Sequence, residues 1–280
     1  MTIELRINGK IKAGPVEKYI HERLDKDGAL HFTLLDPEVK NNGKIENMIE
    51  AAERAGTDAY MIGGSLGVFH SATIHLVKTL KTMTKKPVIV FPGNVDSVVE
   101  MADAIFFMSL LNSSNPYWIS SAQAIGAPVV KALKIEPIPM AYIIMEPGGT
   151  VSFIGDAKPI PNDKPDIAAA YALAGQYMGM RLIYLEAGSG AKKPVHTNVI
   201  KTVRSIVDVP IIVGGGIRSA REARKRVEAG ADIIVTGTMV EKEKDVYKAL
   251  SDVVKAVKAG GKKRLKASRP LLKHLSKAHS

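Results

Sequence analysis

The sequence has no cysteine among its 280 residues, which excludes disulfide bonds and thiolate chemistry. It also has no apolar run near the roughly 20 residues that a membrane-spanning helix requires. Residues 1–10 alternate charged and apolar side chains, so they lack the apolar segment of a signal peptide. These absences are compatible with a reducing cytosol, and we expect a cytoplasmic protein.

Acidic residues are absent from the C-terminal end. The formal net charge is +11, and residues 260–280 carry seven Lys or Arg and no Asp or Glu, so they contribute +7 and the rest of the chain +4. Such segments attract anionic lipid headgroups or nucleic acid, and they also occur as solvated extensions. No aromatic residue is present to stack on bases. We expect a basic tail that is disordered or in peripheral contact with an anionic membrane, and no nucleic-acid partner.

Short apolar runs rich in β-branched residues alternate with segments of helical periodicity along the chain. Runs of this length indicate buried parallel strands, and a barrel of eight such units takes about 250 residues. We therefore predict an α/β fold, a (β/α)8 TIM-type barrel over residues 1–259. The strands are expected at 29–35, 58–62, 87–91, 104–108, 139–145, 182–186, 209–213 and 231–235, with 129–133 as a competing edge strand.

The helices are less evenly distributed than the strands. Residues 16–26 have helical periodicity and are expected to cover the barrel bottom, and the last helix is expected over residues 240–259. Between the third and fourth strands, Asn94 to Asp103 leaves room for about two helical turns. The sequence thus predicts a shortened third crossover and a thin outer ring at that point.

Glycines follow the last three predicted strands, in Tyr184–Gly190, Gly214–Ser219 and Thr236–Thr238. Glycine lets backbone N–H groups approach an anion closely, and a following helix N-terminus adds its positive end. In (β/α)8 barrels the loops after strands seven and eight are the usual phosphate site. The pattern favours a phosphate site over simple tight turns.

Three further groups could carry chemistry at the same mouth. Asp36 and Ser65 end the first two strands and could hold Mg²⁺ together with substrate phosphate oxygens, although Asp-Pro is also a common turn. Glu186, beside a phosphate, would have a raised pKa and act as a general base or only orient a hydroxyl. Lys192, Lys193 and His196 could meet a diphosphate or be solvated.

The stretch from Glu146 to Pro165 is rich in Gly and Pro and long for a β-α connection. Phe153 and Ile154 within it would be exposed on a monomer, which suggests an oligomer interface.

Several motifs resemble those of geranylgeranylglyceryl phosphate synthases: LLDPE (34–38), MIGGS (61–65), LLNSSNPYWI, EPGGTVSFIGDAKPIP, YLEAGSGA, VGGGIRS and TGT. The resemblance extends to about Ala259 and implies transfer of a geranylgeranyl group from its diphosphate to the C3 hydroxyl of sn-glycerol 1-phosphate, the first ether bond of archaeal membrane lipids, in a homo-oligomer such as a dimer or hexamer. It places Mg²⁺ at Asp36 and Ser65 and makes Glu186 and Tyr184 the catalytic pair. It places glycerol phosphate at Tyr184, Leu185, Glu186, Ala187, Gly188, Ser189, Gly190, Gly215, Gly216, Gly237 and Thr238.

The prenyl chain needs a long apolar groove. We expect it where the third crossover is thin, with Trp118, the only tryptophan, as a barrier that limits chain length. Three alternatives stay open at this point: a heptaprenylglyceryl phosphate synthase with a longer donor, a phosphate-binding barrel isomerase, and a basic nucleic-acid-binding or scaffolding protein that depends on the tail.

Overall fold

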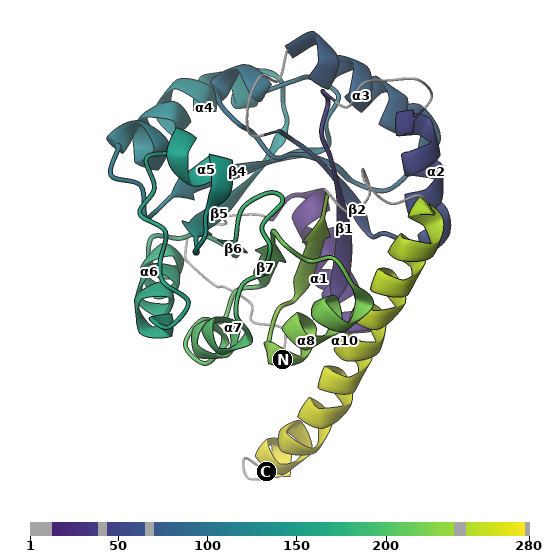
Figure 1. Cartoon of the computed structure of the whole chain (residues 1–280), viewed down its shortest axis with the longest axis vertical. Coiled ribbons are helices and arrows are strands. Elements are labelled where there is room, and N and C mark those ends of the chain that lie inside the picture. Colours follow the sequence, from purple (N-terminus) through teal and green to yellow (C-terminus); the bar gives the residue numbers. More distant parts are fainter. Residues whose placement is uncertain (1–12, 39–43, 65–69, 238–244, 278–280) are drawn as a thin grey trace.

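The computed structural model describes residues 13–38, 44–64, 70–237 and 245–277, with side chains to residue 267. Eight parallel strands form a closed barrel in which β8 pairs with β1 (Figure 1), so the predicted (β/α)8 barrel is confirmed. The strands are β1 (Leu30–Leu35), β2 (Ala59–Ile62), β3 (Val88–Val90), β4 (Ala104–Leu110), β5 (Glu136–Ile144), β6 (Leu182–Glu186), β7 (Ile211–Gly214) and β8 (Ile233–Thr236).

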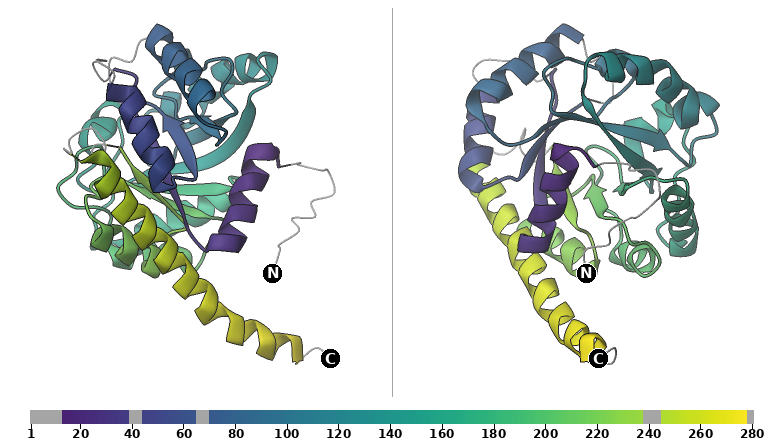
Figure 2. Two further views of the ribbon diagram at one scale, coloured as in Figure 1. Left: turned by 90° about the vertical axis from the view of Figure 1, so that its right-hand side faces the viewer. Right: turned by 180° about the vertical axis from the view of Figure 1, so that it is seen from behind.

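Helices surround the barrel, as two further views show (Figure 2). Only the single 3-10 turn η1 (Val95–Ser97) lies between β3 and β4, which confirms the shortened third crossover. The other helices are α1 (Pro15–Asp27), α2 (Lys44–Ala55), α3 (His70–Met83), the π-helical turn η2 (Tyr117–Ser121), α4 (Ala122–Ala132), α5 (Gly149–Ile154), α6 (Pro165–Tyr177), α7 (Thr197–Arg204), α8 (Ala220–Ala229) and α10 (Val246–Lys277).

The strand side chains divide between two apolar layers. On β6, Leu182 and Tyr184 lie in the barrel interior, whereas Ile183 and Leu185 pack in the layer between strands and helices. Successive strand side chains point to opposite faces, and both faces of a parallel sheet in this fold are covered. This is why the strands are nearly uninterrupted apolar runs, and why alternate residues at their C-terminal ends face the barrel mouth.

The N-terminal end of the barrel is closed by α1. Val16 and Ile20 are buried in the same interior cluster as Leu30 of β1. The carboxylate of Glu136, at the start of β5, accepts the backbone N–H groups of Val16 (2.7 Å) and Glu17 (2.9 Å) at the first turn of α1. A carboxylate at a helix N-terminus satisfies otherwise unpaired N–H groups. The expected position of this helix at the barrel bottom is confirmed.

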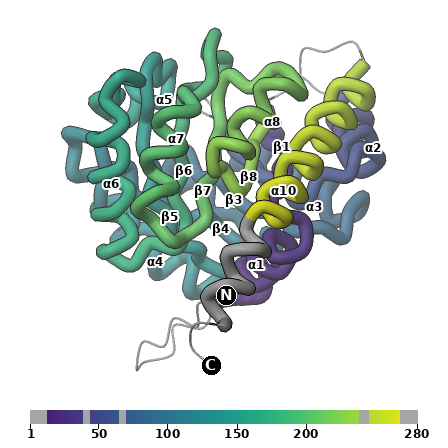
Figure 3. Tube along the Cα trace, turned by 90° about the horizontal axis from the view of Figure 1, so that it is seen from below, coloured from purple at the N-terminus to yellow at the C-terminus, as the bar shows by residue number. Residues whose placement is uncertain are grey.

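Two expectations differ from the structure. Residues 129–133 are not an edge strand: Val129 to Ala132 belong to α4, and β5 begins at Glu136. The boundary expected at residue 260 falls inside one helix, since α10 continues from Val246 to Lys277. Gly261 packs against the α1–β1 turn, where Figure 3 shows α1 and α10 side by side. The prediction of a disordered tail from residue 260 is therefore wrong up to Lys277, because the helix continues past Gly260 and Gly261.

Candidate active site

Glu186 ends β6 on the inner side of the strand, at the mouth of the barrel. Its side chain is 6% exposed, and Oε1 accepts the backbone N–H of Gly188 at 2.6 Å. Burial raises the pKa of Glu186 to about 7, because a carboxylate loses solvation in an apolar site. At neutral pH the group is thus available both as a proton acceptor and as a hydrogen-bond donor.

Tyr184 is the preceding inward-facing residue of β6, two positions before Glu186. It donates its phenol hydrogen to that carboxylate. Its ring stacks on Phe91, with centroids 5.3 Å apart, and meets Tyr142 edge-on at 5.3 Å. Burial and the nearby Glu186 raise the pKa of Tyr184 well above its usual range. Tyr184 therefore stays a neutral donor that orients Glu186.

Glycines form the wall around this carboxylate. A Cβ at Gly215, where φ is +79°, would overlap Glu186 Oε1 and lie 2.8 Å from Gly188 N. A Cβ at Gly188, where φ is +101°, would lie 2.6 Å from the carbonyl oxygen of Gly148. Both positions require glycine, for the left-handed backbone and for the close approach. The loops after β5, β6 and β7 consequently meet backbone to backbone.

The other residues expected at the glycerol phosphate site do not all turn their side chains toward the barrel mouth. Leu185 and Ala187 are buried in the outer layer, so only their backbone can face the mouth. Ser189 and Gly237 line one cavity at the mouth, and Gly190 and Gly216 have positive φ in the same loops. Thr238 and Ser65 lie outside the described residues.

Asp36 follows β1 and lines the same cavity together with Gly63 and Gly64. Its Oδ1 accepts the N–H of Glu38 at 2.9 Å, and burial raises the pKa of Asp36. Within residues 13–38, 44–64, 70–237 and 245–267, no group of three or more His, Cys, Asp or Glu side chains could hold a metal ion. Any metal at Asp36 would therefore take further ligands from elsewhere.

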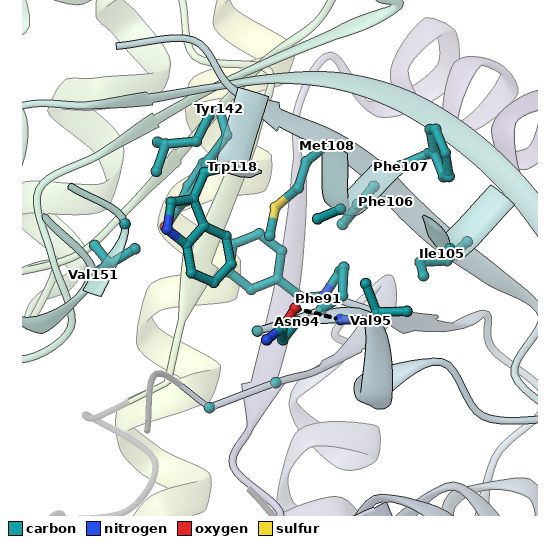
Figure 4. A pocket seen from close by; sticks show the side chains of 18 of the residues that line it. Phe91, Asn94, Val95, Ile105, Phe106, Phe107, Met108, Trp118, Tyr142 and Val151 are labelled. Atoms are coloured by element: carbon teal, nitrogen blue, oxygen red, sulfur yellow. Dashed lines mark hydrogen bonds between the residues drawn. The ribbon is translucent and has the colours of Figure 1, made fainter. Parts of the chain in front are cut away.

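The cavity continues from the mouth to the thin third crossover. It passes inward-facing Phe106 and Met108 of β4 and reaches outward-facing Ile105, and its far end is closed by α4 and the region of η1. β3 has only three residues, so the barrel wall is short along the strand direction there. Figure 4 shows the apolar lining, which includes Phe91, Val95, Ile105, Phe106, Phe107, Met108, Trp118, Tyr142 and Val151. The prenyl groove expected at this place stays a prediction.

Trp118 lies in the middle of these side chains (Figure 4), and the π-helical turn that carries it is held at several points. Gln123 Nε2 donates to the carbonyl oxygens of Met108 (2.7 Å) and Trp118 (3.1 Å). Ser109 Oγ donates to the carbonyl oxygen of Ile119 at 2.7 Å. These bonds hold the backbone of the turn that carries the indole.

Two aromatic residues were missed by the sequence reasoning. Phe91 follows β3 and Tyr142 lies opposite Tyr184 in the β5–β6 register, and both line the cavity. Strand alternation could have placed Tyr142 inside, whereas Phe91 had no signal beyond its place at a strand end. His196 instead caps α7, because its side chain accepts the N–H of Asn198, and Lys192 and Lys193 are exposed.

A family model, curated relatives and a solved structure that resemble this chain give a consistent result. The PcrB family model matches residues 19–258. The geranylgeranylglyceryl phosphate synthase of Pyrococcus horikoshii is 54% identical over 241 residues, covering 86% of this chain and 94% of that protein. The enzyme of the same name from Thermococcus gammatolerans is 56% identical over 239 residues, covering 85% and 94%. The crystal structure of (S)-3-O-geranylgeranylglyceryl phosphate synthase from Thermoplasma acidophilum, in complex with sn-glycerol-1-phosphate, has a TM-score of 0.84 and 42% identity and covers 89% of this chain and 100% of that chain.

Proposed function

Because the chain belongs to the PcrB family, we propose that it transfers a geranylgeranyl group from its diphosphate to the C3 hydroxyl of sn-glycerol 1-phosphate. The observation that carries the proposal is one cavity that joins Asp36 and the glycine loops at the mouth to an apolar passage past Trp118. A phosphorylated acceptor fits the first part and a prenyl chain the second.

The acceptor lies against Glu186 and the loop glycines. Glu186, with a pKa of about 7, binds the glycerol hydroxyls and takes the proton of the C3 hydroxyl as its oxygen attacks C1 of the donor. The new bond is C1–O3, and the bond that breaks joins C1 to the diphosphate, which leaves with its electron pair. Tyr184 holds the carboxylate in place, and the buried site keeps acceptor and donor in line.

The donor set at Asp36 fits Mg²⁺. This ion is usually held by one or two carboxylates together with substrate phosphates and water, and Asp36 supplies one partly buried carboxylate at the cavity wall. When bound, the ion would neutralise charge on the departing diphosphate. Ser65 is the second proposed ligand. In this proposal, the remaining task of the chain at this end of the cavity is to position the diphosphate of the donor beside Asp36.

The length of the donor depends on the passage beyond Trp118. The indole lies among Met108, Val151 and Tyr142 (Figure 4), and we assign it the role of a barrier that favours a C20 chain. A heptaprenyl donor would have to pass this ring. A geranylgeranyl donor is therefore the proposed substrate.

An apolar surface on α4, α5 and α6, on one side of the barrel (Figure 1), supports a homo-oligomer. Phe153 is 84% exposed and Tyr177 78% exposed, and Ile125, Val129, Ile167 and Tyr171 are exposed nearby. Exposed apolar patches of this kind mark interfaces. Light scattering should show a smaller assembly for Phe153→Asp than for Met83→Asp on α3, and equal masses would refute this interface.

The transfer assay tests the function directly. The purified chain, Mg²⁺ and labelled sn-glycerol 1-phosphate are incubated with C15, C20 or C35 diphosphate in parallel, and Asp36→Ala and metal-free reactions serve as controls. We expect most product from C20, and none without metal or Asp36. Absence of product from every donor with a folded chain would refute the synthase and favour a phosphate-binding barrel isomerase. The cytoplasm is the proposed location. Separately, the helices of the described residues contain no stretch that is long and apolar enough to cross a membrane.

A further inference from the structure

The last turns of α10 lie outside the region that the family model matches. That match ends at residue 258, whereas α10 continues to Lys277. Both views of Figure 2 show its C-terminal end projecting beyond the barrel. The barrel fold and the active site do not account for this part of the helix.

The beginning of the projecting part is fixed to the barrel. A Cβ at Gly261 would lie 2.5 Å from the carbonyl oxygen of Asp27, so the helix can approach the α1–β1 turn only with glycine there. Arg264 pairs with Asp232 and donates to the carbonyl oxygens of Ala231 (2.7 Å) and Gly28 (2.9 Å). These contacts set the direction in which α10 leaves the barrel.

Basic residues follow the outer face of α10 between Val246 and residue 267, where its side chains are described. Lys248, Lys255, Lys262 and Lys266 are all exposed and are spaced by seven, seven and four residues. At about 100° per residue this spacing keeps them within a narrow stripe. The basic stripe, as we name it, comprises Lys248, Lys255, Lys262 and Lys266. The sequence continues with the basic residues Arg269, Lys273 and Lys277.

The basic stripe carries little opposing charge. Asp252 is the acidic residue on this face of the described helix, and no acidic residue follows it in the sequence. Lys263 and Arg264, which pair with Glu228 and Asp232 of the barrel, lie off the stripe. With a rise of about 1.5 Å per residue, the stripe is roughly 27 Å long from Lys248 to Lys266. Its partner must therefore be an extended anionic surface.

We propose that the basic stripe of α10 binds the anionic headgroups of a lipid bilayer. Basic residues on one helix face are typical of such contacts, and each adds to the attraction near the surface. A second copy of the stripe would be repelled, and the stripe has no aromatic residue to stack on bases. The choice of a bilayer rests on the proposed function, because a geranylgeranyl donor and its product partition into membranes.

Vesicle co-sedimentation of the full chain, without substrate, tests the proposal. We expect binding to phosphatidylglycerol vesicles that weakens with salt, and little binding to phosphatidylcholine vesicles. Lys262→Gln with Lys266→Gln should weaken binding about 30-fold, at roughly fivefold for each lysine. The matched control is Lys78→Gln with Lys85→Gln, which removes the same charge from exposed lysines on another face and should weaken binding less than about threefold.

The outcomes are separable from those of the transfer reaction. Equal loss in both double variants would show a response to net charge alone and overturn the proposal, as would failure of the full chain to bind anionic vesicles at low salt. Tighter binding to a DNA duplex than to vesicles would also overturn it. Transfer activity in detergent should be unchanged in both double variants. Vesicle binding without transfer would refute the proposed function and leave the stripe intact.

Discussion

Gly215→Ala is the substitution that tests the site geometry most directly. The added Cβ would overlap Glu186 Oε1, which accepts the N–H of Gly188 at 2.6 Å, and it would lie 2.8 Å from Gly188 N and O. Backbone surrounds it on that side, so the carboxylate has to move. We expect the hydrogen bond between Gly188 and Glu186 to break and the glycerol hydroxyls to lose their acceptor.

Two free-energy terms contribute to the effect. Alanine in a left-handed conformation costs about 1–2 kcal/mol, and Gly215 has φ +79°. A hydrogen bond to a charged group contributes about 1.5–3 kcal/mol. The free energy of unfolding should therefore fall by roughly 3–5 kcal/mol. If the second term also acts on the bound acceptor, affinity for sn-glycerol 1-phosphate should fall about tenfold to a hundredfold.

Gly179→Ala is the matched control, because Gly179 has φ +89° and a Cβ there meets nothing within 4 Å. It should lower the free energy of unfolding by only the backbone term, and leave acceptor binding unchanged. Calorimetric unfolding measures the first quantity and titration calorimetry the second. Equal destabilisation by the two substitutions, together with wild-type affinity in Gly215→Ala, would refute the assigned contact between the glycine wall and Glu186.

Two further predictions concern the passage and α10. Trp118→Ala should shift the preference among C15, C20 and C35 diphosphates toward the longest donor in a competition assay, and an unchanged preference would remove Trp118 as the barrier. Arg264→Ala should lower the free energy of unfolding by about 2–3 kcal/mol, because it deprives Asp232 and the carbonyl oxygens of Ala231 and Gly28 of a donor. Lys263→Ala, at an exposed ion pair with Glu228, should cost less than about 1 kcal/mol, so equal costs in denaturant titrations would contradict the role of Arg264.

The barrel and the mouth of its site could be predicted because their signals are local. On β6 the two-residue alternation alone places Tyr184 and Glu186 on the inner face, and the glycines after β7 lie at a strand end where the backbone has positive φ, which favours glycine. The short segment between β3 and β4 likewise shows in the spacing of apolar runs. Each of these inferences needs only neighbours in the sequence.

The end of α10 could not be predicted because its determinants are distant in the sequence. Gly260 and Gly261 look like a helix stop, yet a Cβ at Gly260 would meet Val227 and one at Gly261 would meet the α1–β1 turn. These glycines allow close packing, and the helix continues through them. Residues 129–133 were ambiguous for a similar reason: their β-branched pair is part of α4, where Val130 packs in the outer layer.

Two buried groups, His31 and Glu186, should give the free energy of unfolding an unusual dependence on pH. His31 is fully buried in the outer layer, where its ring nitrogens contact Thr57 Oγ1 (3.1 Å) and Thr236 Oγ1 (2.9 Å). Burial lowers the pKa of His31 from 6.5 to about 4. Burial raises the pKa of Glu186 from 4.5 to about 7. Both groups therefore prefer to be neutral in the folded chain.

The two shifts act on stability with opposite signs. Between pH 4 and 6.5 the unfolded chain binds a proton at His31 that the folded chain does not, so the free energy of unfolding rises with pH by roughly 3 kcal/mol. Between pH 4.5 and 7 the folded chain keeps a proton on Glu186 that the unfolded chain releases, so the free energy of unfolding falls with pH by a similar amount. In the wild-type chain these contributions largely cancel.

Single variants should reveal each slope. In urea titrations at pH 5 and 6.5, Glu186→Gln should gain stability as the pH rises, because only the contribution of His31 remains. His31→Asn should lose stability over the same interval, whatever constant cost the substitution adds. Parallel slopes in the two variants would show that one of these groups is solvated in the folded chain. If Glu186 is the solvated one, it cannot hold a proton at neutral pH, and its assignment as the group that takes the C3 hydroxyl proton would lose its physical basis.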